Sequence, residues 1–233
     1  MRLSTDSNGI ANIPSDALAA LYFLPGQYIF ANFQEGATAI KALSTTQVAR
    51  AFQDVNTDTG WLGRCVMRYR EAPDGNSILS YEPASMRKIL VVSGSGAIEE
   101  LRIPLPTLIL LGNGRDHYLW ASASSSVSPK TKLAVAPFPN IGSGKICFGR
   151  NDVPATHAST LNAVWKLIFE TPFNHDHANN RCNSHADDIR VLLKKIAADK
   201  LRKFPKSELI TSSTTVEDAW ETLVERRRYD SRF

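Results

Sequence analysis

Short apolar runs separated by turn-forming residues dominate the first half of the chain. Residues 18–23 and 28–33 flank Pro25 and Gly26, and a Pro-Gly dipeptide between two apolar runs is typical of a hairpin turn. The spacing of apolar residues over 45–53 predicts a short helix. Further strand-like runs occupy residues 61–69, 77–81 and 88–92. We therefore expect the first half to be rich in β-sheet.

A second hairpin is predicted within residues 105–122. Residues 105–111 and 117–122 are largely apolar, and the sequence GlyAsnGlyArgAsp between them suits a tight turn. After a polar run and a short strand at 133–135, the chain enters an irregular segment at residues 137–154 that is rich in Pro and Gly. Irregular segments of this length inside compact domains are usually functional.

The periodicity becomes helical after this segment. Two sets of apolar residues recur at i, i+3, i+4 and i+7, namely Leu161, Val164, Trp165 and Ile168, and Ile189, Leu192, Leu193 and Ile196. Each set makes one apolar face that should pack on a sheet. A third helix is predicted around Trp220, and capping-box spacing places helix starts at Ser184 with Asp187 and at Thr214 with Glu217. Strands followed by helices are the order of an α+β fold.

The composition narrows the class of protein. The chain has 233 residues, of which 43% are hydrophobic, and this is enough to bury a sizeable core. It lacks an apolar leader and a run of about 18 uninterrupted apolar residues, so we expect a cytoplasmic protein with no membrane partner. Three widely spaced cysteines argue against a disulfide framework and for free thiols.

The net charge of +4 is modest, but positive residues gather late in the chain. They are Lys194, Lys195, Lys200, Arg202, Lys203, Lys206, Arg226, Arg227 and Arg228. A solvated helix face accounts for such a run, and a patch for an acidic partner or nucleic acid is the alternative. The interpretation adopted is the solvated face, so a nucleic-acid partner is not expected.

The irregular segment carries the most specific motif. Pro139 and Asn140 follow a strand, glycines permit tight turns, and Cys147 stands between Ile146 and Phe148. This resembles the signature of ubiquitin-conjugating enzymes, in which HisProAsn is followed by a glycine, a β-branched residue, the catalytic cysteine and a large apolar residue. Two features depart from the eukaryotic pattern. Phe138 replaces the histidine, and the interval to Cys147 is about one residue shorter.

The stretch TrpLysLeuIlePheGluThrProPheAsnHis at residues 165–175 resembles a prokaryotic branch of that superfamily. This branch contains protein B of the PRTRC systems and the conjugating enzymes of bacterial ubiquitin-like and antiphage operons. The resemblance implies an α+β fold with a ubiquitin-conjugating-enzyme-like core, an antiparallel β-meander with flanking helices, at residues 76–233. Residues 1–75 would then be an N-terminal β-rich extension.

The same resemblance implies an activity. Cys147 would accept a ubiquitin-like protein from a ubiquitin-activating enzyme as a thioester and pass it to a lysine of a protein target. The amide of Asn140 would stabilise the oxyanion or hold the loop in place. Asp152 and His157 are candidates to orient or deprotonate the amine, with capping or solvent exposure as the alternative for each. No cofactor and no metal are expected.

Three other interpretations compete with this one. A cysteine hydrolase would pair Cys147 with His157 or His175, although no helix start is predicted at the cysteine. A zinc-binding interaction module would use His175, His177, Cys182 and His185, whose spacing fits no standard finger. GlySerGlyLys at residues 142–145 is similar to a phosphate-binding loop, but Pro139 replaces its first glycine and Ile146 its Ser/Thr.

Overall fold

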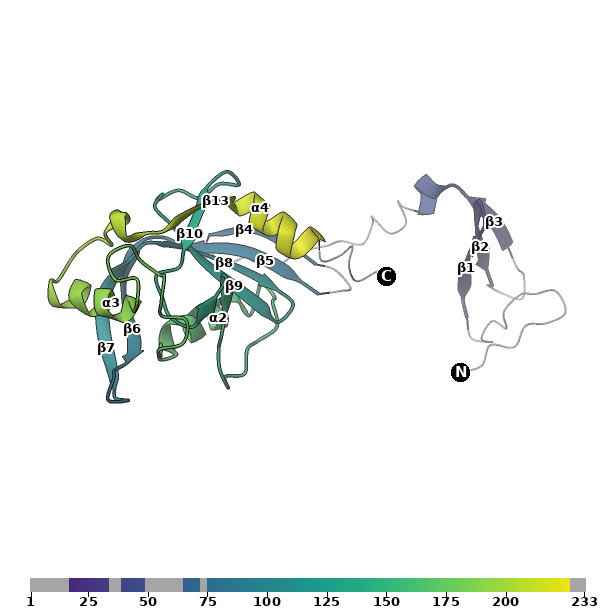
Figure 1. The fold of residues 1–233 in the computed structure, drawn as a ribbon. Helices are drawn as coiled ribbons and strands as arrows, with labels where there is room; N and C mark the ends of the chain where they lie inside the picture. The colour runs from purple at the N-terminus through teal and green to yellow at the C-terminus, as the bar shows by residue number, and fades with distance from the viewer. Residues whose placement is uncertain (1–16, 34–38, 49–64, 72–74, 227–233) are drawn as a thin grey trace. The chain divides into compact units, whose positions relative to one another are not determined.

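The structure, a computed structural model, describes residues 17–33, 39–48, 65–71 and 75–226. The chain divides into two compact units, residues 1–59 and residues 60–233, and each has a sheet of its own (Figure 1). The division expected between residues 75 and 76 stays a prediction.

The first unit is a three-stranded antiparallel sheet in the order β1-β2-β3. Its strands are β1 (Ala19–Leu24), β2 (Gln27–Asn32) and β3 (Ala39–Leu43). Leu24 pairs with Gln27 across the Pro25-Gly26 turn, which confirms the predicted hairpin. Residues 45–48 are helical and begin at a reciprocal capping box between Ser44 and Gln47. The rest of the helix predicted at 45–53 lies outside the described residues.

The second unit is built on an antiparallel sheet in the order β11-β12-β9-β8-β5-β4, which β10 and β13 extend beside β9. Its strands in chain order are β4 (Val66–Arg70), β5 (Ser77–Glu82), β8 (Thr107–Asn113), β9 (Asp116–Ser122), β10 (Lys132–Val135), β11 (Ile141–Gly142), β12 (Lys145–Ile146) and β13 (Thr211–Thr215). The strands predicted at 77–81 and 133–135 and the hairpin within 105–122 are confirmed. Of the run at 61–69, residues 66–69 are strand, Cys65 is in a turn, and residues 61–64 lie outside the described residues.

A two-stranded ribbon of β6 (Ser85–Val92) and β7 (Ile98–Leu105) lies between β5 and β8 in the chain. Strand β6 contains the run predicted at 88–92, whereas β7 was not predicted. Its signal was present in part, because Leu101 and Ile103 are buried on either side of the exposed Arg102. A parallel bridge between Val91 and Phe173 ties the ribbon to the segment after α2.

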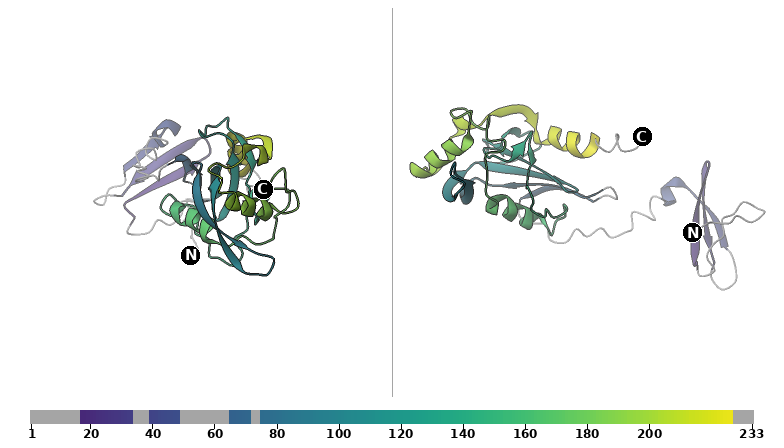
Figure 2. Two further views of the ribbon diagram at one scale, coloured as in Figure 1. Left: turned by 90° about the vertical axis from the view of Figure 1, so that its left-hand side faces the viewer. Right: turned by 60° about the horizontal axis from the view of Figure 1, so that its bottom comes forward.

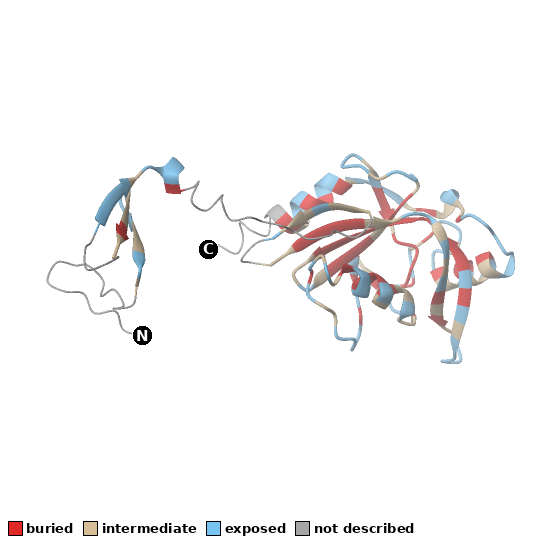
Figure 3. Cartoon of the chain, turned by 180° about the vertical axis from the view of Figure 1, so that it is seen from behind, coloured by how far each residue is buried: buried red, intermediate tan, exposed pale blue. Residues whose placement is uncertain are grey.

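Helices cover both faces of the main sheet (Figure 2). Along β8, Leu108 and Leu110 join one hydrophobic core with α2 (Leu161–Glu170) and α3 (Ile189–Ala198), while Ile109 and Leu111 join a second core with α4 (Val216–Trp220). Alternate residues of a strand point to opposite faces, so β8 is buried on both sides. Figure 3 shows the buried residues concentrated along these central strands.

The helical faces confirm the predicted periodicity. The buried residues of α2 and of α3 are the two predicted sets at i, i+3, i+4 and i+7. Helix α2 packs against β6 and α3 against β7, so both apolar faces lie on the ribbon as well as on the shared core. Together with the antiparallel sheets, they give the described residues the α+β architecture expected.

Both predicted helix starts are wrong. Helix α3 begins at Asp188, whose side chain accepts from the Arg190 N–H, whereas the Ser184 N–H donates to Glu208 at 2.9 Å. The capping box of α4 joins Thr215 and Asp218, one residue later than predicted. Residues 221–226 continue α4 as a π-helix. Within the described residues, no helix has both the length and the apolar character needed for a membrane span.

Candidate active site

The segment between β10 and α2 is anchored in the core by Phe138. This residue is fully buried and stacks on Phe173 with ring centroids 4.9 Å apart. Phe138 is the residue that stands where the eukaryotic pattern has a histidine. An apolar ring therefore holds this end of the loop by packing on an aromatic partner, a favourable arrangement for two buried rings.

A small hairpin precedes Cys147. Strands β11 (Ile141–Gly142) and β12 (Lys145–Ile146) pair through a two-residue turn in which Ser143 and Gly144 have φ of 49° and 87°. Positive φ at both central residues is the requirement of a type I′ turn. The phosphate-loop interpretation is therefore wrong, because GlySerGlyLys forms this turn and the Lys145 ammonium pairs with Asp116 at 2.7 Å.

Asn140 connects the cysteine to the segment behind it. Its carbonyl accepts from the Cys147 N–H at 2.7 Å, and its own N–H donates to the Asp176 carbonyl at 2.6 Å. Its side-chain Oδ1 accepts from the Asn174 N–H at 2.9 Å. The residue has φ of 60°, a left-handed conformation that Asn tolerates better than most residues.

The hydrogen bond from Asn174 also fixes the orientation of the Asn140 amide. A backbone N–H can only donate, so the atom that faces it must be oxygen. The Nδ2 group then points away from Asn174, and it has no acceptor among the described residues. The Nδ2 group is therefore a neutral donor without a partner among the described residues.

Cys147 is an exposed free thiol. Its neighbours Ile146 and Phe148 are both only 9% exposed, so the apolar residues on either side anchor the backbone while the thiol faces outward. A small hollow beside the thiol is lined by Asn140, Ile141 and Phe148 and by residues 171–173 after α2. The chain then turns at Gly149, with φ of 62°, so no helix begins at the cysteine.

The polar segment at residues 174–188 holds this loop in place through hydrogen bonds. The sequence did not predict this role. In addition to the bonds from Asn140, the guanidinium of Arg181 donates to the carbonyls of Ile141 and His177. The His177 ring lies 3.2 Å from where a Cβ on Gly142 would be. A run of Asn, Asp and His without periodicity carries no signal for this role, since the contacts depend on where the chain folds back.

The other candidate residues have local partners. Nδ1 of His157 lies 2.7 Å from the Ser159 hydroxyl, and the His157 ring packs edge-on against Tyr69. Nδ1 of His175 lies 3.0 Å from the guanidinium of Arg190. Asp152 is exposed. In the described part of the chain neither histidine contacts Cys147, so no Cys-His pair supports the hydrolase interpretation.

The four residues of the zinc alternative do not converge. His177 faces Gly142, and the buried thiol of Cys182 donates to the His185 carbonyl at 3.3 Å. Burial raises the pKa of the Cys182 thiol, which favours its protonated form over a metal-binding thiolate. No group of three or more His, Cys, Asp or Glu residues within the described ranges could hold a metal ion. The zinc alternative gains no support.

Comparison with known families decides the class of the protein. Residues 39–212, which are most of the chain, match prokaryotic E2 family D. The chain belongs to prokaryotic E2 family D. This confirms the prokaryotic resemblance carried by the loop motif and by residues 165–175. No curated protein and no solved structure matches the chain.

Membership in this E2 family indicates, in general terms, an enzyme of the ubiquitin-like conjugating type. An E2-family protein interacts with ubiquitin-like proteins and activating enzymes. The match spans β3 to β13, so it includes the whole loop with Asn140 and Cys147.

Proposed function

We propose that this E2-family protein carries a ubiquitin-like protein as a thioester on Cys147 and transfers it to a lysine amine of a protein target. The observation that carries the proposal is the exposed thiol at the end of a loop whose backbone is fixed on both sides of it. An acyl carrier must meet an activating enzyme and then a target, and an exposed, rigidly held thiol is open to both.

Two displacements make up the proposed reaction. The Cys147 thiolate attacks the carbonyl carbon of the activated C-terminus, the new C–S bond forms, and the thiol of the activating enzyme leaves. A lysine amine then attacks the thioester, the C–S bond breaks, and the amine loses its proton to give an amide. Each displacement passes through an oxyanion. The Nδ2 group of Asn140 is the neutral donor proposed to stabilise it.

We propose further that residues 60–233 contain a ubiquitin-conjugating-enzyme-like core. Its meander would be β4-β5-β8-β9, with the β6–β7 ribbon inserted and α2 following the cysteine loop. A place in a bacterial ubiquitin-like conjugation or antiphage operon is part of the proposal. The identity of the neighbouring genes tests it.

The decisive experiment is loading of the protein with its ubiquitin-like partner, the activating enzyme and ATP. The wild-type protein should form an adduct that reducing agent removes. Cys147→Ser should form a reductant-resistant oxyester, and Cys182→Ser should load like the wild type because Cys182 is buried. A thiol-sensitive adduct that persists in Cys147→Ser would refute the assignment. Cleavage of a ubiquitin-like fusion without an activating enzyme would favour the hydrolase alternative.

The role of Asn140 can be separated from its structural bonds by Asn140→Asp. Aspartate keeps Oδ1 as the acceptor for the Asn174 N–H and tolerates positive φ, but it lacks the Nδ2 donor. Discharge of the preformed thioester to free lysine should slow by about 10²–10³-fold, the usual cost of losing an oxyanion donor. The melting temperature should stay close to that of the wild type. Wild-type discharge in this variant would leave Asn140 with a structural role alone.

A further inference from the structure

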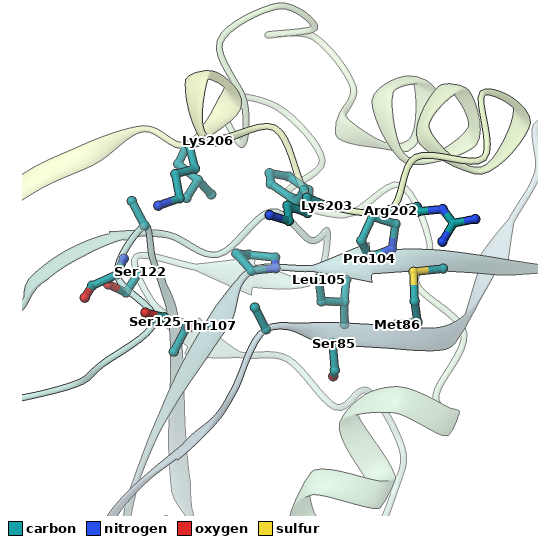
Figure 4. Close-up of a pocket in the computed structure, with 16 residues that line it drawn as sticks. Ser85, Met86, Pro104, Leu105, Thr107, Ser122, Ser125, Arg202, Lys203 and Lys206 are labelled. Atoms are coloured by element: carbon teal, nitrogen blue, oxygen red, sulfur yellow. The ribbon is translucent and has the colours of Figure 1, made fainter.

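Three adjoining hollows form one groove on the second unit. The central pocket, of about 310 Å³, is lined by the start of the β6–β7 ribbon, by residues 122–125 and by the segment after α3 (Figure 4). A hollow of about 570 Å³ shares Met86 and Arg202 with it, and one of about 430 Å³ shares residues 122–124. We call this continuous surface the basic groove.

The charge of the basic groove has one sign. Of the residues that the structure describes, seven cationic ones line it, namely Arg102, Lys130, Lys132, Lys200, Arg202, Lys203 and Lys206, and no described Asp or Glu does. All seven are exposed. None of them forms an ion pair with a carboxylate of the described residues, whereas other exposed lysines, such as Lys88 and Lys145, do. The sequence hides the clustering of these cations, because they come from three separate places in the chain, namely residue 102, residues 130–132 and residues 200–206.

The cations are held on a fixed wall. Phe204 and Leu209 are buried in the core and pin the segment after α3, so Lys203 and Lys206 lie beside the pocket. Figure 4 shows these lysines with Arg202 along one side, and Ser122, Ser125 and Thr107 along the other. A preformed array of charges loses less entropy on binding than a flexible one.

The backbone conformation of Lys200, on the same side of the groove, is also unusual. Lys200 has φ of 51°, at the helix C-terminus where Gly or Asn is the usual residue. A lysine in this left-handed conformation costs stability relative to glycine. A cation is therefore held at this edge of the basic groove in spite of a local conformational cost.

We propose that the basic groove binds an extended acidic segment of a partner protein. Carboxylates complement the seven cations, and the apolar floor made by Met86, Pro104 and Leu105 accepts an apolar side chain of the same segment. Single-stranded nucleic acid needs exposed aromatic rings for base stacking. Among the described residues that line the groove, Phe204 is the one aromatic side chain, and it is only 7% exposed.

Fluorescence anisotropy of a labelled peptide with glutamates on both sides of a central leucine tests this on the full-length protein. The peptide should bind saturably at low ionic strength and weaken with added salt, because salt screens exposed charges. Lys203→Gln/Lys206→Gln should bind about tenfold more weakly, as expected for two exposed charge pairs. Lys166→Gln/Lys195→Gln removes the same charge from the helices and should bind like the wild type.

A further variant guards against loss of binding through misfolding. Lys200→Gly removes a groove cation while relieving the positive φ, so it should bind the peptide more weakly and yet melt at a higher temperature than the wild type. Equal binding by both double variants, or equal binding of the peptide with glutamine in place of glutamate, would overturn the proposal. Preferential binding of a single-stranded oligonucleotide of the same charge would also overturn it.

Discussion

At the scale of single residues, the cysteine loop depends on groups that are not themselves reactive. Phe138 supplies the apolar anchor, Asn140 makes three hydrogen bonds to its neighbours, and Gly144 allows the hairpin turn to approach the sheet. The Cys147 thiol is exposed, but its backbone position is set by the buried residues and hydrogen bonds around it. Substitutions at these supporting residues should therefore affect the loop before they affect the rest of the fold.

Gly144 gives a direct test of this close approach. A Cβ at this position would lie 2.9 Å from the indole nitrogen of Trp120, and φ is 87°. Gly144→Ala should therefore lower the free energy of unfolding by about 1–3 kcal/mol, measured by chemical denaturation. Gly149→Ala is the matched control, because its φ of 62° is also positive but no atom lies within 4 Å of the new Cβ. Equal losses in the two variants would show that the contact with Trp120 is unimportant.

His117 makes the stability depend on pH. It is buried on β9, its ring lies edge-on to Phe148, and burial lowers the pKa of its imidazole below the ordinary value. The folded protein therefore holds His117 neutral under conditions in which the unfolded chain binds a proton. Its contribution to stability is complete above the unfolded pKa of about 6.5 and is lost as the pH falls through that value towards the folded pKa.

We expect the free energy of unfolding to fall below about pH 6.5, with a limiting slope for this group of about 1.4 kcal/mol per pH unit. Denaturation curves recorded across this range measure the slope. His117→Gln cannot bind the proton, so its stability should change less with pH. If the two proteins show the same pH profile, other groups cause the dependence.

At the scale of elements, the segment 174–188 packs against residues 138–148 and holds this loop in place through hydrogen bonds. It has little regular structure, yet its Asp176 carbonyl accepts from the Asn140 N–H, its Asn174 N–H donates to the Asn140 side chain, and its Arg181 guanidinium donates to the Ile141 carbonyl. Arg181 is half-buried, and this burial lowers the pKa of its guanidinium. This arrangement couples the β11–β12 hairpin to a segment that lies about 40 positions later in the chain.

Arg181→Met should release the hairpin because it removes the donors to the carbonyls of Ile141 and His177. We expect slower thioester formation on Cys147 and a loss of stability of about 1–3 kcal/mol, since two carbonyls lose a charged donor. Gel assays of loading and thermal melting measure the two effects. Arg181→Lys should restore little, because an ammonium cannot reproduce the planar fork of the guanidinium. Full activity of the Met variant would contradict the positioning role.

At the scale of the whole molecule, both hydrophobic cores belong to the second unit. Their members, including the partly buried residues packed against them, lie between Val66 and Val224. Strand β4 pairs with β5, and its Tyr69 and Val66 pack on the first core. The second unit thus contains the contacts that should allow it to fold alone.

Truncation distinguishes the two possible domain boundaries. A chain of residues 60–233 should unfold cooperatively, with a melting temperature close to that of the main transition of the full-length protein. A chain of residues 76–233 lacks β4 and exposes the edge of β5, so it should be less stable or aggregate. Circular dichroism and size-exclusion chromatography measure both. Equal stability of the two fragments would support the boundary at residue 75 instead.

The sequence by itself determined the features that depend on local periodicity and local chemistry. The buried faces of α2 and α3, the hairpin at Pro25 and Gly26, and the exposed cysteine in an irregular loop all follow from spacing within a few turns of chain. Strand β7 also has a local pattern of apolar residues, although it was not predicted. The helix starts failed because several neighbouring polar residues offered similar capping spacing, and only the geometry selected Asp188 and Thr215.

Tertiary structure alone decided which distant residues meet. The bond between Asn140 and Asn174 and the support from Arg181 join segments about 34 and 40 positions apart. The basic groove collects cations from β7, from the strand β10 region and from the segment after α3. Polar and charged residues in aperiodic segments have no regular spacing from which their tertiary contacts could be predicted. Their neighbours are set by how the apolar faces pack, and that packing is a property of the folded chain as a whole.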